Sequence, residues 1–255
     1  MVEAALAECA EQRSGGGEGR HPGADHTDHT EPLCILDLGT GTGCIGLSVL
    51  HGIPPATPAV CVGLDLSEAA LLLARANAAR LRQEHRLPDG DGAPARRFST
   101  CCGSFGELHG PAMAVQLERA TGGRRYDLVV SNPPYLTRKA ATETLSPSSI
   151  AHEPREAFVL SRSGGGGGGT GGTGGEAGAG GALAAYSAIG RSLQSARERG
   201  APILAAGGSV VLEVPPDRKL HRAVKAELED CGLAFVREFR DGAGMRRGLI
   251  FRGSL

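Results

Sequence analysis

The stretch Leu33-Cys-Ile-Leu-Asp-Leu-Gly39-Thr-Gly41-Thr-Gly43 decides the fold. Its apolar first half predicts a buried parallel strand, because both faces of such a strand are covered. The glycines that follow allow a tight turn and a close approach of the backbone to a ligand. The apolar segment 44–50 then predicts a helix, whose first N–H groups and positive dipole end favour a bound ligand. This order indicates a ligand-binding loop at the edge of an α/β sheet.

The alternation of strand and helix continues along the chain. The strands are expected at 33–38, 59–64, 97–100, 126–131, 208–214, 233–239 and 246–252, and the helices at 44–50, 67–86, 105–119, 182–199 and 217–231. Such alternation predicts an α/β fold with a doubly wound, mostly parallel, seven-stranded sheet and helices on both faces. The last two strands flank the turn Asp241-Gly-Ala-Gly, which predicts a C-terminal antiparallel hairpin.

Two stretches fall outside this alternation. Residues 1–31 are polar, with a glycine run and a His/Asp-rich patch, so a disordered N-terminal tail is expected before a single domain at 32–255. Residues 164–181 contain 13 of the 40 glycines of the chain. Such a stretch cannot bury enough apolar surface to offset the loss of backbone entropy on folding. A disordered glycine-rich insertion is therefore expected at 163–181.

Composition narrows the class of partner. The formal net charge of −1 is not the footprint of a protein that holds long nucleic acid, so no stable nucleic-acid binding is expected. No apolar run approaches the roughly 20 residues that span a bilayer, so no membrane association is expected. The seven cysteines lack metal-ligand spacing, which favours buried free thiols over a metal site. An intracellular monomer is expected, in the cytoplasm or in an organelle.

The glycine loop permits two interpretations. Gly41-x-Gly43-x-x-Gly46 satisfies the dinucleotide pattern, and Asp65 follows Gly43 by 22 residues, where a ribose-binding acid is expected. A dehydrogenase is therefore one alternative. Asp37 favours a methyl donor instead, because an acid at the strand end suits an ammonium group and would repel a pyrophosphate. The two oxygens of Asp65 can accept from both ribose hydroxyls, although Asp65 could also be an acid of N-cap type.

The helix expected at 67–86 would cover the sheet with one apolar face. Its predicted members are Ala70, Leu73, Ala74, Asn77 and Leu81.

The tetrapeptide Asn132-Pro133-Pro134-Tyr135 follows the fourth strand, at the carboxyl edge where ligands of such folds bind. Asn132 offers a side-chain carbonyl oxygen and Pro133 a backbone carbonyl oxygen, and both prolines restrict the backbone. Two acceptors can orient a planar –NH2 group and draw its hydrogens out of the plane in which the nitrogen lone pair is delocalised. The exposed lone pair then suits in-line methyl transfer, with the Tyr135 ring packed against the target plane. The plainer alternative is a strand-ending Pro-Pro turn with Asn132 as turn former.

These segments resemble the signatures of the HemK/PrmC family, the release factor glutamine methyltransferases. The similar segments are 37–45 (Asp-Leu-Gly-Thr-Gly-Thr-Gly-Cys-Ile), 63–71, 130–135 (Val-Ser-Asn-Pro-Pro-Tyr), Glu153-Pro-Arg and 207–214. The resemblance covers about residues 33–253. It implies a Rossmann-like class I methyltransferase fold, S-adenosyl-L-methionine as methyl donor, and a translation (peptide chain) release factor as partner. The acceptor would be the glutamine of its Gly-Gly-Gln motif.

The resemblance also implies roles for individual residues. The donor would contact Asp37, Gly39, Thr40, Gly41, Thr42, Gly43, Asp65, Phe105 and Asn132. The substrate would contact Asn132, Pro133, Pro134 and Tyr135, of which Asn132, Pro133 and Tyr135 would be catalytic. Ser104 stands where the family tends to have an acid, and the helical N-terminal domain usual in the family has only a short tail in its place here.

Two further functions remain open. One is an amino-methyltransferase of adenine or guanine in RNA or DNA, supported by the arginines near the C-terminus. These are Arg237, Arg240, Arg246, Arg247 and Arg252. The other is a non-catalytic subunit that binds S-adenosyl-L-methionine.

Overall fold

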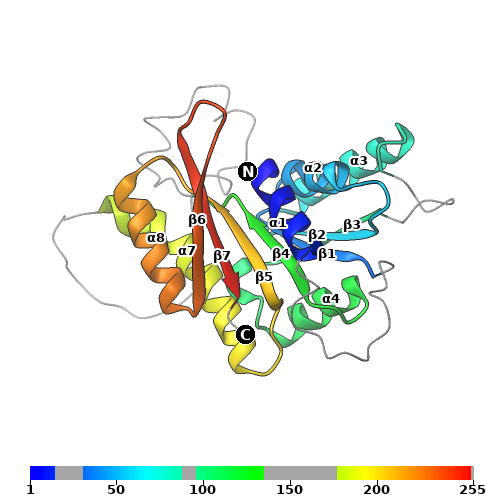
Figure 1. Cartoon of the computed structure of the whole chain (residues 1–255). Helices are drawn as coiled ribbons and strands as arrows, with labels where there is room; N and C mark the ends of the chain where they lie inside the picture. The colour runs from blue at the N-terminus through cyan, green and yellow to red at the C-terminus, as the bar shows by residue number, and fades with distance from the viewer. Residues whose placement is uncertain (15–30, 88–95, 135–176, 254–255) are drawn as a thin grey trace, which may run out of the picture.

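The computed structural model describes residues 1–14, 31–87, 96–134 and 177–253 (Figure 1). Seven strands form one sheet in the order β3-β2-β1-β4-β5-β7-β6. The strands are β1 (Leu33–Leu38), β2 (Ala59–Asp65), β3 (Arg96–Cys102), β4 (Tyr126–Ser131), β5 (Leu204–Glu213), β6 (Leu233–Arg240) and β7 (Arg246–Gly253). β1 to β5 are parallel, and β7 runs antiparallel to both β5 and β6. The predicted fold class, including the C-terminal hairpin, is confirmed.

The register of the sheet creates the place for a ligand. β1 lies between β2 and β4, and Leu38 at its end pairs with Leu64 on one side and Ser131 on the other. The chain therefore winds outward in both directions from β1, so the β1–β4 boundary is the topological switch point. In open α/β sheets, ligands bind beyond the carboxyl ends of the strands at such a point.

Helices cover both faces of the sheet (Figure 1). They are α1 (Val2–Ser14), α2 (Cys44–Gly52), α3 (Glu68–Gln83), α4 (Pro111–Thr121), α7 (Ala177–Glu198) and α8 (Arg218–Asp230), with a 3₁₀ turn η2 (Phe105–Glu107). Buried residues of α1, α2 and α3 join one core, and those of α4, α7 and α8 join a second core on the opposite face. None of the described helices is long and apolar enough to cross a membrane.

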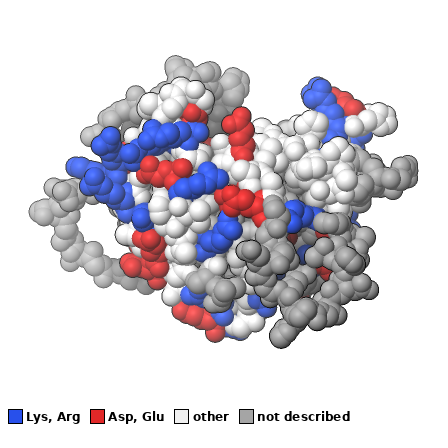
Figure 2. All heavy atoms as spheres, in the orientation of Figure 1, with Lys and Arg blue, Asp and Glu red and all other residues white. Residues whose placement is uncertain are grey.

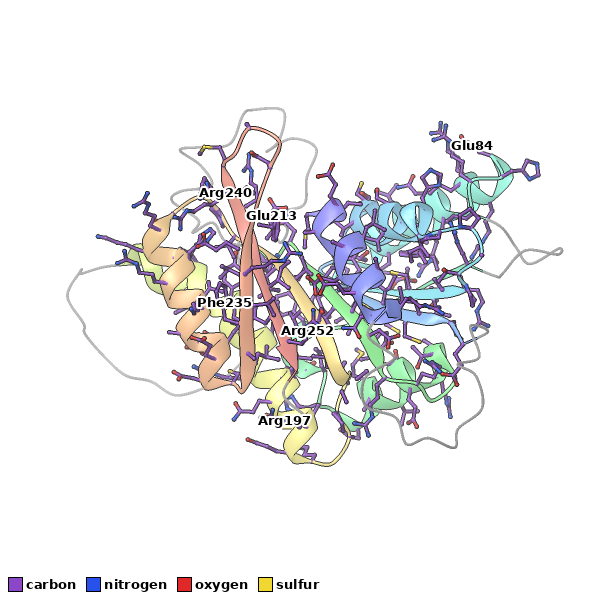
Figure 3. The ribbon with its side chains drawn as sticks, in the orientation of Figure 1. Glu84, Arg197, Glu213, Phe235, Arg240 and Arg252 are labelled. Atoms are coloured by element: carbon purple, nitrogen blue, oxygen red, sulfur yellow. The ribbon has the colours of Figure 1, made fainter. Side chains whose placement is uncertain are left out.

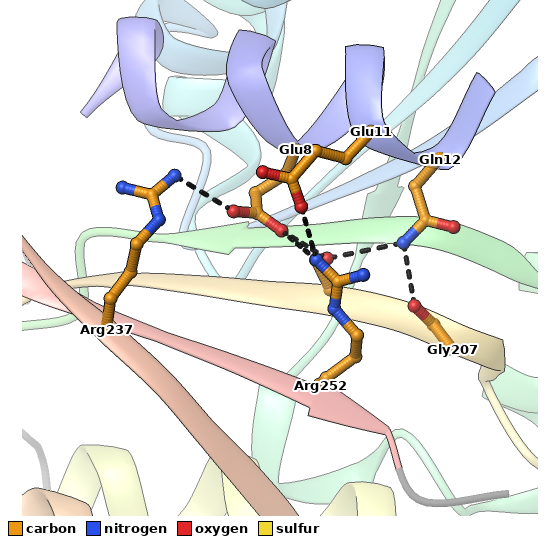
Figure 4. Close-up of polar contacts among 7 residues, drawn as sticks. Glu8, Glu11, Gln12, Gly207, Arg237 and Arg252 are labelled. Carbon is orange, nitrogen blue, oxygen red and sulfur yellow. Dashed lines mark hydrogen bonds and ion pairs between the residues drawn. The ribbon is translucent and has the colours of Figure 1, made fainter. Parts of the chain in front are cut away.

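The expectation of a disordered tail is wrong for residues 2–14, which form α1 and pack against the sheet (Figure 4). Glu8 is fully buried, and its carboxylate contacts Arg237 at 3.1 Å and Arg252 at 2.8 Å. Ser209 Oγ also donates to Glu8 at 2.7 Å. The partners of Glu8 lie more than 200 positions away, so no local pattern reveals that this polar segment is held. Residues 15–31, the rest of the expected tail, lie outside the described residues apart from Glu31.

Three helix expectations also need correction. The helix expected at 105–119 is divided into η2 and α4, because Pro111 suits a helix start and Gly110 occupies the N-cap. α7 begins at Ala177, inside the expected insertion, while residues 163–176 lie outside the described residues. On α3 the buried face includes Leu71, whereas Leu73 is 56% exposed.

Candidate functional site

The glycine loop forms a left-handed cradle between β1 and α2. Gly39, Gly41 and Gly43 have φ of 70°, 55° and 82°, a region that side-chain-bearing residues rarely adopt. The Gly39 and Thr40 N–H groups donate to the Leu64 carbonyl at 2.8 and 3.0 Å. A Cβ atom built on Gly39 or Gly41 would meet nothing within 4 Å, so the cradle is open on the side of these two glycines.

The side chain of Asp37 holds this loop in place through hydrogen bonds. It is fully buried, and its Oδ2 accepts from Thr40 Oγ1 at 2.7 Å and from the Gly46 N–H at 2.9 Å. Its Oδ1 is buried and has no hydrogen-bond partner among the described residues. Burial raises the pKa of Asp37 to about 6, against the lowering effect of its hydrogen bonds from Thr40 and Gly46. One carboxylate oxygen thus supports the loop and the other remains an unused acceptor.

Asp65 lies at the end of β2 and connects three elements. Its Oδ2 accepts from the Gly41 N–H at 2.9 Å, and its Oδ1 accepts from the Ser67 N–H at 2.9 Å. Ser67, not Asp65, is the N-cap of α3, because its Oγ accepts from the Ala70 N–H at 3.3 Å. Each carboxylate oxygen can accept more than one hydrogen bond, so Asp65 retains acceptor capacity for a ligand.

The two threonines of the loop have different surroundings. Thr40 is 6% exposed and is held by Asp37, so its side chain serves the loop. Thr42 is exposed, and its carbonyl accepts from Asn77 Nδ2 at 2.9 Å. Asn77 was expected on the buried face of its helix. The structure instead shows Asn77 exposed, with its side chain hydrogen-bonded to the glycine loop.

Phe105 does not present an open ring. It is 9% exposed and belongs to the core on the α4, α7 and α8 face, where it begins η2. Ser104, at the position expected to be acidic, caps this turn by accepting from the Gly106 N–H at 3.1 Å. A large apolar side chain that sequence reasoning missed is Leu66, which is 62% exposed directly after Asp65. Exposure of a leucine directly after the loop-binding Asp65 is a signal that only the structure provides.

The Asn132 segment leaves the sheet on the other side of the switch point. Ser131 Oγ donates to the Leu38 carbonyl at 2.7 Å, which ties the end of β4 to the end of β1. Asn132 beyond it is exposed, Pro133 is buried and Pro134 is partly buried. The structure therefore brings the glycine loop and Asn132 to one sheet edge. Tyr135 and Glu153-Pro-Arg lie outside the described residues.

Comparison with known proteins identifies relatives with one described activity. No protein-family model matches the chain. It is 33% identical over 213 residues to a release factor glutamine methyltransferase of Bordetella pertussis, covering 84% of this chain and 58% of that protein. It is 34% identical to the protein of the same name from Cereibacter sphaeroides, covering 85% and 59%. The chain thus spans less than two thirds of the length of these relatives.

Among solved structures, the ribosomal protein L11 methylase from Lactobacillus delbrueckii subsp. bulgaricus matches 99% of this chain and 80% of its own, with a TM-score of 0.47 and 12% identity.

Proposed function

We propose that this chain transfers a methyl group from S-adenosyl-L-methionine to the side-chain amide nitrogen of the glutamine in the Gly-Gly-Gln motif of a translation release factor. The observation that carries the proposal is the common edge of the glycine loop and Asn132, joined by the Ser131–Leu38 hydrogen bond at 2.7 Å. The similarity to proteins named release factor glutamine methyltransferases supports the choice of acceptor.

The residues of the cradle fit the donor. S-adenosyl-L-methionine supplies an electrophilic methyl group and carries an ammonium group, a carboxylate and two ribose hydroxyls. The unpaired Oδ1 of Asp37 is a buried acceptor that suits the ammonium group. Asp65 retains acceptor capacity for the ribose hydroxyls, and Leu66 offers exposed apolar surface to the adenine. The open sides of Gly39 and Gly41 leave room for the donor.

Asn132 and Pro133 would orient the acceptor. The side-chain oxygen of Asn132 and the carbonyl oxygen of Pro133 accept from the two N–H bonds of a planar amide. Holding both hydrogens out of the amide plane would take the nitrogen lone pair out of conjugation, so that it could attack the donor's methyl carbon in line with the thioether that leaves. Catalysis then comes from positioning and fixed dipoles, and the amide proton leaves to solvent after transfer.

The structure weakens the support for the nucleic-acid alternative. Four of the five arginines that suggested it form ion pairs within the chain. Arg237 and Arg252 contact Glu8, Arg246 contacts Glu238, and Arg247 contacts Asp241. Charges neutralised inside the fold are less available to phosphates.

The decisive experiment incubates the chain with purified release factor and donor carrying a labelled methyl group, followed by mass spectrometry of the Gly-Gly-Gln peptide. Label on the glutamine supports the proposal, and a release factor with alanine in place of that glutamine is the control. Absence of label from the wild-type acceptor, with donor binding established by calorimetry, would contradict it and favour a non-catalytic subunit. Label on added RNA instead would favour the amino-methyltransferase.

A further inference from the structure

The charges of α8 are arranged against the helix dipole. Its first two turns carry Arg218, Lys219, Arg222 and Lys225, whereas Glu227, Glu229 and Asp230 lie at its end. Helices are stabilised by acids near the N-terminus and bases near the C-terminus, so charges placed the other way round are unfavourable. Only the N-cap Asp217 follows the favourable pattern, accepting from the Lys219 N–H at 2.7 Å. The basic side chains therefore add to the positive end of the helix dipole at the start of α8.

The start of α8 borders a hollow shared with the hairpin. The hollow is lined by Arg218, His221, Arg222, Lys225, Glu238 and Arg246, among others. Figure 2 shows Lys and Arg side chains gathered over this part of the molecule, and Figure 3 places Arg240 at the outer end of the same hairpin. His221 is 2% exposed, and its Nδ1 makes no hydrogen bond with the described residues.

Some of these cations are already engaged. Arg246 contacts Glu238 at 2.9 Å, and Lys225 lies 4.0 Å from the centre of the Phe235 ring. Arg218, Lys219 and Arg222 are exposed and form no ion pair with the residues that the structure describes. We call the set Arg218, Lys219 and Arg222 the basic face.

The basic face lies on the same edge of the sheet as Asn132. α8 follows the carboxyl end of β5, and Val214 donates to the Arg247 carbonyl at 2.8 Å. β4, β5, β7 and β6 are consecutive neighbours in the sheet. Since neighbouring strands are about 4.8 Å apart, the hairpin lies on the order of 10–15 Å from β4. That separation exceeds the size of an amide and suits a second contact with a macromolecular acceptor.

We propose that the basic face docks an acidic surface patch of the protein whose glutamine is methylated, a proposal that rests on the proposed function. Charge complementarity of this kind steers encounter and fixes the orientation of a partner more than it adds affinity. The face would hold the acceptor protein so that its glutamine reaches Asn132.

A compact acidic patch fits the surface better than a nucleic acid does. Glu238 lies within the hollow, 3.4 Å from His221 Nδ1. The far half of α8 carries Glu227, Glu229 and Asp230. A long polyanion following the helix would meet these acids, whereas a patch of a few carboxylates would meet only the basic face.

The test is a double charge reversal, Arg218→Glu with Arg222→Glu. The matched control is Arg119→Glu with Arg199→Glu, which changes the net charge equally on two exposed arginines near the amino edge of the sheet. Binding of purified release factor is measured by calorimetry without donor, so that the result does not depend on turnover. We expect the dissociation constant to rise at least about tenfold for the first pair only, with a weaker dependence on salt than the wild type shows.

Methyl transfer is then measured at saturating acceptor. Unchanged kcat and unchanged donor affinity in the first pair support a docking role. The proposal is overturned if the wild type does not bind release factor, if both pairs weaken binding equally, or if the first pair weakens binding of a labelled RNA and not of the release factor. Binding that follows the expected pattern, without any methyl transfer, would overturn the proposed function and leave the docking surface supported.

Discussion

Asp65 Oδ2 accepts a hydrogen bond from the Gly41 N–H at 2.9 Å, so the end of β2 fixes the glycine loop that leaves β1. The other oxygen of the same carboxylate fixes Ser67 at the start of α3. One side chain thus sets the relative positions of both halves of the proposed donor site, before any contact with the donor itself.

Replacing Asp65 should weaken donor binding strongly. Asp65→Ala removes the support of Gly41 and the proposed ribose acceptors, and hydrogen bonds to a charged group contribute about 1.5–3 kcal/mol each. The donor dissociation constant, measured by calorimetry, should rise at least about tenfold. Asp65→Asn keeps one acceptor oxygen and should lie between the two. An unchanged affinity in Asp65→Ala would show that the donor does not use this carboxylate.

Gly63 tests how closely the loop lies against β2. A Cβ atom at this position would stand 2.8 Å from both Thr40 Oγ1 and Thr40 Cγ2, and 3.0 Å from the Phe98 ring. Gly63→Ala should therefore displace Thr40, weaken donor binding and lower the free energy of unfolding by about 1–3 kcal/mol. Gly242→Ala, where a Cβ atom meets nothing within 4 Å, is the control and should change neither quantity.

Asn132 should matter for turnover and little for the donor. Asn132→Ala removes one of the two oxygens that would orient the acceptor amide, and the loss of one such polar contact costs about 100-fold or more in kcat. Asn77→Ala provides the contrast, because it loosens the glycine loop at Thr42 and should raise the donor dissociation constant while sparing kcat at saturating donor. A donor defect alone in Asn132→Ala would contradict the proposed role.

The buried Asp37 predicts a pH dependence of stability. Burial raises its pKa from 3.8 to about 6, so the folded state holds this proton more tightly than the unfolded state does. The contribution to the unfolding free energy is therefore fully present below about pH 4, is lost as the pH rises through about 6, and is on the order of 3 kcal/mol. Asp37→Asn should lack this pH-dependent contribution. Urea unfolding should therefore show that the stability of the variant, relative to the wild type, is higher at pH 7 than at pH 4. Parallel profiles for both proteins would refute this.

At the contact between α1 and the hairpin, loss of Glu8 and loss of its arginine partners should lower the free energy of unfolding by different amounts. Its side chain is fully buried, whereas those of Arg237 and Arg252 are 42% and 33% exposed. Glu8→Gln leaves two solvated arginines and should cost about 1 kcal/mol. Replacing both arginines with methionine leaves a buried carboxylate and should cost about 3–5 kcal/mol. Guanidinium unfolding measures both, with Glu3→Gln, an exposed acid on the same helix, as the control. The opposite order would be inconsistent with a buried charge at Glu8.

Much of this architecture was predictable because it is encoded locally. All seven strands were predicted, and the ends of β1 and β4 follow from apolar runs that stop at Gly39 and Pro133. The loop residues Asp37 and Asp65 were likewise found from their place at strand ends. Their contacts with Gly41, Gly46 and Ser67 were not predicted, because a strand end shows where a side chain lies and not which backbone groups it will meet.

The errors concern residues whose partners are distant in the sequence. Nothing near Glu8 indicates Arg237 or Arg252, and nothing near Asn77 indicates the carbonyl of Thr42. The burial of Phe105, which the resemblance implies as a donor contact, likewise depends on the second core, which forms with α4, α7 and α8. Such features depend on tertiary packing, which periodicity does not record.

The contact between Glu8 and Arg252 joins positions 244 apart. During synthesis, α1 emerges long before β7, so the carboxylate of Glu8 has no arginine to receive it until the hairpin has paired with β5. Contacts of such large sequence separation form late and slow the folding of a chain. A chain interrupted before β7 would therefore leave the buried carboxylate of Glu8 without its contact with Arg252, even where α1 already packs against α2 and β4. The charge buried on the first helix is thus compensated in full only when the last strand is in place.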